Sequence, residues 1–435
     1  MSTRNYVKGD IKVLNAWAFY DWANSVYPLV ISSSVFPIYY GALFIDDLYI
    51  DVFGFNFKNT ALISFLTAFA FIILSFITPL LSGIADYMGN KKTFLKFFCY
   101  LGSISCIGLY WFDLENIYLG LFFYFMALIS FWASLVFYNS YLPDIANKDQ
   151  QDYISAKGYA LGYVGSVILL IFNLAMVMFP DSFGIEGVNP EHTAMKYSFV
   201  SVGLWWIIFS QYTFHHLPII TDKRKIIKHV IFNGFKELQE VWNELRHIII
   251  IKKFLIAFFI YSSALQTVLI IATYFGEQEI AWKEGTKTTG LIISILLIQL
   301  IAIIGAMFTA KISKKIGNIR TLLILNLIWA FLCIGAYFIK EPIEFYIAAG
   351  AVGLVMGGIQ ALSRSTFSKL IPDTDNTTSY FSFFDVSQKV SIVLGMTLFA
   401  ILDQTTGSMR ISILIFVLIF LIGAFLLNKI KIKNV

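Results

Sequence analysis

Residues 61–82 read ALISFLTAFAFIILSFITPLLS, an apolar run without a charged side chain. A bilayer core about 30 Å thick is crossed by a helix of about 20 apolar residues, so this run is predicted to span a membrane. The same window, moved outward along the chain, predicts an all-α membrane protein with twelve transmembrane helices. They lie roughly at 14–41, 61–82, 93–112, 117–138, 154–178, 196–217, 253–275, 288–310, 321–339, 343–363, 381–402 and 410–428.

The composition of the whole chain points the same way. Of its 435 residues, 58% are hydrophobic and 14% are charged, whereas soluble domains carry about 25% charged residues. The basic residues are dispersed over short connectors, so the net charge of +5 does not indicate a nucleic-acid partner. Cys99, Cys106 and Cys333 fall inside apolar segments and are expected to be packing residues. The polar first ten residues do not resemble a signal peptide, so we expect the first span to be retained.

The basic residues also predict the orientation in the bilayer. With the N-terminus placed in the cytoplasm, 26 of the 32 Lys and Arg residues fall on the cytoplasmic side of the twelve spans. The remaining six are Lys58, Lys196, Lys283, Lys287, Lys340 and Arg410. Because cytoplasmic loops are enriched in Lys and Arg, we expect both termini to lie in the cytoplasm.

A charged connector separates two sets of six spans. We expect an N-terminal half at 1–217, a cytoplasmic connector at 218–252 and a C-terminal half at 253–435. Apolar residues recur at helical spacing within the connector, which predicts an amphipathic helix along the cytoplasmic membrane face. These residues are Ile231, Phe235, Leu238, Trp242, Leu245 and Ile249. We interpret this helix as a tether between the halves, with a regulatory partner site as the alternative.

The two halves repeat each other weakly in sequence. GNKKT at 89–93 follows the second span, and GNIRT at 317–321 follows the eighth, an offset of 228. LPD at 142–144 and IPD at 371–373 follow the fourth and tenth spans, an offset of 229. Two matches at nearly one offset predict two parallel six-helix repeats, which is an architecture of secondary transporters.

The loop at 82–92, SGIADYMGNKK, resembles the cytoplasmic loop signature of the major facilitator superfamily. Gly89 permits a tight turn, and Asp86 can accept hydrogen bonds from a helix N-terminus. Lys91 and its neighbour Lys92 are expected to hold the loop inside. The resemblance implies that this loop contacts the second half when the cytoplasmic side is closed, so we assign Asp86, Gly89 and Lys91 to gating. The second copy has Lys314 at the acidic position, so we expect this charge arrangement in the first half alone.

Further segments resemble the autophagy-related vacuolar effluxer family and its prokaryotic relatives. They are FYDWANS at 19–25, FYNSYLPD at 137–144, GYALGY at 158–163 and GGIQALSRS at 357–365. In eukaryotic members the resemblance implies release of amino acids from vacuoles. For this compact chain it implies a multi-pass protein of a prokaryotic plasma (inner) membrane.

Polar residues inside the spans are candidates for a substrate and proton site, because ionisable groups there are costly and usually face a cavity or a partner. Asp21, Asn24 and Ser25 share one helix face, and Pro28 is expected to loosen this helix. A structural hydrogen-bonding role is the alternative. The other candidates for this site are Tyr20, Tyr138, Asn139, Gln266, Gln360 and Arg364.

Some of these candidates have a second interpretation. Gln266, Gln299 and Gln360 could join helices instead of binding a solute. Arg364 could extend its side chain to the cytoplasmic interface instead of binding an anion. Asp385 and Lys389 are four residues apart and are expected to pair, as a gate or as a binding site; we place them with the gating residues.

The leading hypothesis is a secondary active transporter of a small polar solute that works by alternating access. Amino acids are the candidate solutes, and protons are the candidate coupling ions. We expect no enzymatic activity, cofactor or metal, since the chain has no ATP-binding loop, zinc-binding helix motif or nucleophile elbow. A lipid or lipid-linked solute carrier, or a non-transporting membrane receptor or scaffold, is the alternative.

Overall fold

The computed structural model describes residues 6–44, 49–52, 54–219 and 230–430, and these residues are nearly all helical. The first half contains α1 (Ile11–Asn24), the π-helix η1 (Tyr27–Val35), α2 (Phe36–Leu43), α3 (Asn59–Met88), α4 (Lys91–Gly108), η2 (Leu109–Trp111), α5 (Ile117–Asn139), α6 (Tyr141–Ile145), α7 (Lys148–Met178), η3 (Pro180–Phe183) and α8 (Pro190–His216). The hairpin of β1 (Tyr49–Val52) and β2 (Phe55–Lys58) precedes α3. After the connector helix α9 (Val230–His247) come α10 (Ile249–Glu279), α11 (Lys287–Ile316), α12 (Asn318–Phe338), α13 (Pro342–Leu370), α14 (Thr377–Thr406) and α15 (Met409–Asn428).

The helices fit a multi-pass membrane protein. Within the described residues, eleven spans are long and apolar enough to cross a bilayer. The twelfth predicted span corresponds to α8, whose His, Trp, Tyr and Ser residues make it more polar than the others. The elements agree with the predicted two-repeat architecture, and the amphipathic helix is present as α9.

The first predicted span is not one continuous α-helix. It runs over Ile11–Leu43 and changes from α1 into the π-helix η1 at Tyr27, with Pro28 at the first positions of η1. Proline cannot donate the backbone hydrogen bond that an α-helix requires, and π-helical segments are rare and frequent at functional sites. Pro28 was expected to loosen this helix, and it lies where the α-helix gives way to a π-helix.

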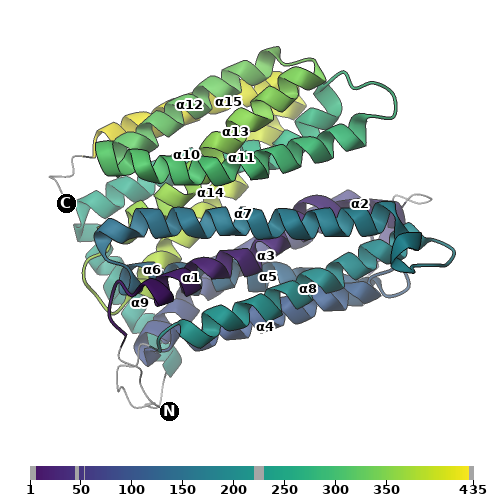
Figure 1. Ribbon diagram of the computed structural model, residues 1–435. Helices are drawn as coiled ribbons and strands as arrows, with labels where there is room; N and C mark the ends of the chain where they lie inside the picture. The colour runs from purple at the N-terminus through teal and green to yellow at the C-terminus, as the bar shows by residue number, and fades with distance from the viewer. Residues whose placement is uncertain (1–5, 45–48, 53, 220–229, 431–435) are drawn as a thin grey trace.

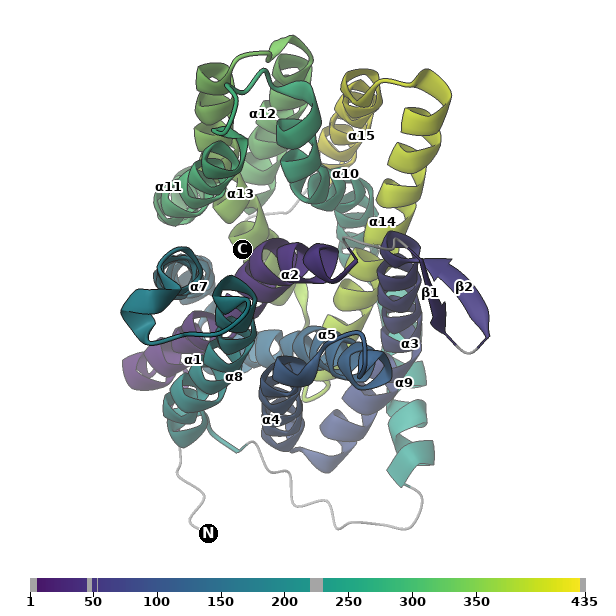
Figure 2. The same ribbon diagram turned by 90° about the vertical axis from the view of Figure 1, so that its right-hand side faces the viewer.

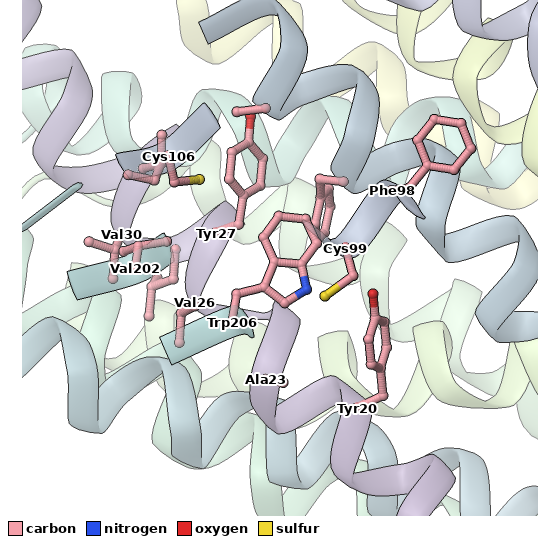
Figure 3. Close-up of a cluster of buried hydrophobic side chains, with 14 of the residues drawn as sticks. Tyr20, Ala23, Val26, Tyr27, Val30, Phe98, Cys99, Cys106, Val202 and Trp206 are labelled. Atoms are coloured by element: carbon pink, nitrogen blue, oxygen red, sulfur yellow. The ribbon is translucent and has the colours of Figure 1, made fainter. Parts of the chain in front are cut away.

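The two halves lie side by side, and each has its own hydrophobic core (Figures 1 and 2). In the first core, the first span packs against α4 and α8 through large side chains, among them Tyr27 and Trp206 (Figure 3). Cys99 and Cys106 lie in this core, and Cys333 lies in the second, so all are buried packing residues as predicted. α1 begins and α15 ends at the same end of the molecule, which we call the termini side (Figure 1).

The connector helix α9 packs against α3 on the termini side. Gly234 and Gly83 lie where the two backbones approach closely, and a methyl group at either would collide with the other helix. Leu245 of the predicted apolar face is buried, as is Val241, whereas Phe235 and Trp242 of that face are exposed. Exposed apolar side chains are compatible with a helix that lies along a membrane face.

Candidate functional site

A cavity of about 1020 Å³ lies between the two halves. Its floor includes Asp21 and Arg364, and its walls reach Ile38 of α2 and the ends of α10 and α11. Glu277 and Lys287 at the far end form an ion pair whose side chains are 48% and 46% exposed, so the cavity opens opposite the termini side. Its size is in the range of small-molecule binding sites.

An ion pair between the halves forms the floor of this cavity. Asp21 of α1 accepts hydrogen bonds from both terminal nitrogens of Arg364 of α13, at 3.2 Å each. The Tyr138 hydroxyl of α5 donates to the same carboxylate oxygen at 2.9 Å. Asp21 and Arg364 are only 5% and 3% exposed, so both charges are buried and depend on each other.

The Arg364 side chain is held on all sides. Its Nε donates to the Ser155 hydroxyl at 2.9 Å, one Nη donates to the Ser155 carbonyl at 2.9 Å, and the other donates to Asn139 at 3.3 Å. Aromatic rings of Trp17 and Tyr159 lie 4.9 and 4.3 Å from the guanidinium carbon, which adds cation–π attraction. The alternative that Arg364 extends to the membrane interface is therefore wrong.

Small residues of α7 make room for the ion pair. A methyl group at Gly158 would collide with the Asp21 carboxylate, and one at Gly162 would collide with the Ser25 hydroxyl. α1 and α7 can therefore approach closely where the charges meet.

The other candidate residues divide into those that line the cavity and those that do not. Asn24, Ser25, Asn139, Gln266 and Gln360 line it. Gln360 also accepts a hydrogen bond from Tyr163 of α7 at 2.9 Å, so it joins the halves as well as facing the cavity. The Asn24 amide nitrogen is buried without a partner in the described structure, which leaves a donor for a solute.

Tyr20 does not belong to the cavity. It is fully buried in the first half, with its ring 4.9 Å from that of Tyr138 and 6.1 Å from that of Phe214 (Figure 3). Adjacent helix positions are rotated by about 100°, so Tyr20 points into the core when Asp21 points to the cavity. Its assignment to the substrate site was wrong.

Asp86 lies on the termini side, where it contacts the second half. Its carboxylate accepts hydrogen bonds from the backbone N–H groups of Thr378 and Ser379, at 3.1 and 2.6 Å. These residues begin α14, whose unpaired N–H groups and dipole favour a negative charge. Gly89 ends α3 in the left-handed conformation, with φ of 63°, and so provides the tight turn after Asp86.

Lys91 is buried on the termini side and bridges several groups. Its Nζ is paired with Asp144 and donates to the Ser140 carbonyl and the Thr377 hydroxyl, each at 2.9 Å. Thr377 belongs to α14, so Lys91 also joins the two halves. The adjacent Lys92 donates to the Leu217 carbonyl at 2.6 Å within the first half.

A second cluster on the termini side was not predicted. Asp152 of α7 accepts from Lys369 of α13 at 2.5 Å and from Asn318 of α12 at 2.8 Å. Ser313 of α11 donates to the same carboxylate at 3.4 Å. The signal available in the sequence was Asn318, which lies in the second copy of the repeated loop motif.

Asp385 and Lys389 pair on α14, and the side chains of both are buried. They lie inside the span, and the neighbouring Gln388 and Ile392 line the cavity. The pair joins two residues of one helix, so it does not cross between the halves.

The family model described as "Vacuole effluxer Atg22 like" matches residues 10–434. The chain belongs to this family. The match covers nearly the whole chain, including both halves and the connector. An uncharacterized MFS-type transporter of Bacillus subtilis, YxiO, is 30% identical over 95% of this chain and 93% of its own length. Autophagy-related protein 22 of Kluyveromyces lactis is 26% identical over 89% of this chain and 80% of its own length.

Solved structures show the same fold. The major facilitator superfamily transporter FucP in its outward conformation matches with a TM-score of 0.69 and 15% identity, covering 97% of this chain and 99% of that chain. The proton:xylose symporter XylE matches with a TM-score of 0.70 and 12% identity, covering 97% and 95%. The chain is therefore a multi-pass transporter of the major facilitator superfamily, related to Atg22 and its prokaryotic relatives.

Proposed function

We propose that this chain carries a small polar solute with a carboxylate group, an amino acid, across a bacterial plasma membrane together with a proton that binds to Asp21. The single observation that carries this proposal is the Asp21–Arg364 ion pair at the floor of the cavity. A carboxylate-bearing solute can take the place of Asp21 beside Arg364, since a guanidinium binds carboxylates in two-pronged geometry. Asn24 then supplies a free donor beside the solute.

Proton coupling follows from the shared use of Arg364. While Asp21 is charged, it occupies the guanidinium and closes the floor between the halves. Protonation removes the charge of Asp21 and leaves Arg364 without its partner, which favours binding of the solute carboxylate. Proton and solute therefore bind together in this proposal, and their release restores the ion pair.

We also propose that the halves at 1–217 and 253–435 rock around this site and that the termini side is cytoplasmic. The orientation is supported by the excess of basic residues in the connectors on that side. Alternating access of this kind is common among transporters built from two parallel repeats. The described structure has its cavity open on the opposite side, with Asp86, Lys91 and Asp152 joining the halves on the termini side.

Purified protein in liposomes tests the proposal through solute-dependent proton flux. Asp21→Asn should abolish uphill, proton-driven accumulation but retain solute exchange and binding, because the amide imitates a protonated carboxyl. Arg364→Gln should lose binding of carboxylate solutes. Asp113→Asn is the matched control, since Asp113 lies in the loop before α5, outside the cavity lining, and should leave both measurements unchanged.

Three outcomes would contradict this proposal. Unimpaired proton-driven uptake by Asp21→Asn would remove Asp21 from coupling. Equal loss of binding and exchange in that variant would instead indicate that Asp21 contacts the solute directly. Absence of flux with every carboxylate solute, together with flux of lipid-like solutes, would favour the lipid carrier.

A further inference from the structure

A buried ion pair lies at the interface between α3 and α14, outside the cavity. Asp385 and Lys389 are one turn apart on α14, and their side chains are 9% and 0% exposed. α3 packs against α14 here, and its Thr78, whose hydroxyl donates to the Leu74 carbonyl of the same helix, is the neighbouring side chain of Asp385. Gln388 and Ile392, which share this helix face, line the cavity, whereas Asp385 and Lys389 are not part of its lining.

This pair differs from the ion pairs that connect the halves. Asp21 pairs with Arg364 of the other half, and Asp152 pairs with Lys369 of the other half. Asp385 and Lys389 sit on one helix, and so they stay together when α14 moves away from α3. The neighbouring side chain of α3, Thr78, is uncharged. Separating the halves therefore breaks no charge pair at this place.

Closing the halves has a cost here. When α3 covers the pair, both charges lose water, while the attraction between them is present in either state. Desolvation of two ions can exceed their mutual attraction in a dry interface. The pair therefore opposes closure, whereas the Asp86 contact with α14 favours it.

A proton-carrying role suits this pair poorly. Protonating Asp385 would leave the fully buried Lys389 as an uncompensated charge, which is strongly unfavourable in a low-dielectric interface. A pair that neutralises itself within one helix is therefore suited to keeping its charge in both states.

We infer that burial of Asp385 and Lys389 destabilises the closed state of the termini side. The states with this side open and closed are thereby kept close in free energy. This inference rests on the alternating access of the proposed function, and it does not depend on the identity of the solute. It replaces the expectation that the pair is a gate or a binding site.

The test measures the open fraction of the termini side by pulsed dipolar spectroscopy in nanodiscs. Spin labels at the exposed residues Lys148 of α7 and Lys315 of α11 report the separation of the halves. Each variant is made in the wild type and in the Asp86→Asn background. The open fraction should be larger in that background, so that both a rise and a fall of the open fraction can be observed. Transport is not the readout, so failure of the proposed solute leaves this measurement intact.

The double variant shows whether the pair destabilises or stabilises the closed state, by the direction in which the ratio of open to closed protein changes. Replacing both charges, Asp385→Asn with Lys389→Met, should lower the ratio of open to closed protein about tenfold, because the dry interface no longer holds ions. Asp385→Asn alone should raise that ratio about tenfold, because Lys389 is left unpaired. The exchanged pair, Asp385→Lys with Lys389→Asp, should keep the wild-type ratio.

If the pair stabilised the closed state, the ratio of open to closed protein would rise in both the single and the double variant. That result would overturn the inference. An unchanged ratio in all variants would overturn it as well. Asp113→Asn with Lys196→Met removes a partly exposed pair within the first half and is the control for loss of two charges. If the single variant does not fold, the double variant and the exchanged pair still decide the sign.

Discussion

The two copies of the repeated loop hold the halves together in different ways. In the first copy, Asp86 reaches across to the backbone of α14. In the second copy, Lys314 stands at the corresponding position, and the carboxylate is Asp152 on the receiving helix α7. The first contact joins a carboxylate to backbone N–H groups, and the second joins side chains to each other.

The capping of the receiving helices explains this difference. The side chain of Asn376, which precedes α14, donates to Glu237 of α9 and makes no cap bond, and the first turn of α14 has no acidic residue. α7 has its own capping box, in which the Asn147 N–H donates to Gln150 at 3.0 Å. Its first turn also contains the acidic residue Asp149. A helix that lacks its own cap can be capped by the other half, so closure of the termini side completes α14.

The largest effect is expected when both contacts are removed. Asp86→Asn with Asp152→Asn should raise the ratio of open to closed protein on the termini side about fiftyfold or more, at least about 2 kcal/mol, because separated contacts add. The spin-label distance between Lys148 and Lys315 measures this ratio. If the double variant stays as closed as the wild type, neither contact determines the closed state.

Asp86→Asn alone should raise that ratio about tenfold or more. Hydrogen bonds to a charged acceptor contribute about 1.5–3 kcal/mol, and an amide accepts them less well. Transport should slow, while equilibrium solute affinity stays within several-fold, because Asp86 is far along α3 from the cavity residues. Stopped-flow transport and binding assays measure the two quantities. A collapse of affinity with a normal rate of conformational exchange would contradict the gating assignment.

The sequence predicts many of the groups that take part in these contacts, but it does not predict the distant residues that they contact. The spans, the repeat and the turn at Gly89 follow from local patterns, and the pairing of Asp385 with Lys389 follows from helical spacing. The partners of Asp86 could be predicted only as a helix of the second half. Local patterns identify which groups need partners, and they do not identify the distant segment that supplies them.

The contacts that were missed connect residues far apart in the chain. Asp21 and Arg364 are separated by 343 positions, and Asp152 and Asn318 by 166. Their pairing depends on how the halves meet. A looser helix was expected at Pro28, but the π-helix that begins at Tyr27 was not predicted, because its winding depends on packing of the first span in the whole first half. Tyr20 was misplaced because neighbouring positions on one helix face different surroundings.

A smaller effect is expected for Asp152→Asn alone. Its partner Lys369 keeps 23% of its side chain exposed, so water can replace part of the lost interaction. The ratio of open to closed protein should rise about fivefold, near 1 kcal/mol. Lys369→Gln should have the same effect, and combining the two should add little. Strongly additive effects of these two substitutions would show that they act through different contacts.

The smallest effect is expected for Lys314→Asp, which gives the second loop the acid of the first. Lys314 is exposed, and its neighbour Ser313 contacts Asp152, so the new carboxylate would lie beside this interface. The start of α7 already has a local capping box of Asn147 and Gln150, so a second acceptor should add little. The ratio of open to closed protein should change less than about twofold.

The same substitution should gain an effect when the cap of α7 is removed. In a background with Asn147→Ala and Gln150→Ala, the N–H groups at the start of α7 lack their local acceptors. Lys314→Asp should then favour the closed state about fivefold, since a carboxylate at a helix N-terminus contributes about 1 kcal/mol. Closure by Lys314→Asp in the wild-type background would mean that the local cap does not determine which half supplies the acid. Absence of any effect in the uncapped background would mean that position 314 cannot reach α7, and the two loops would then differ in geometry as well as in charge.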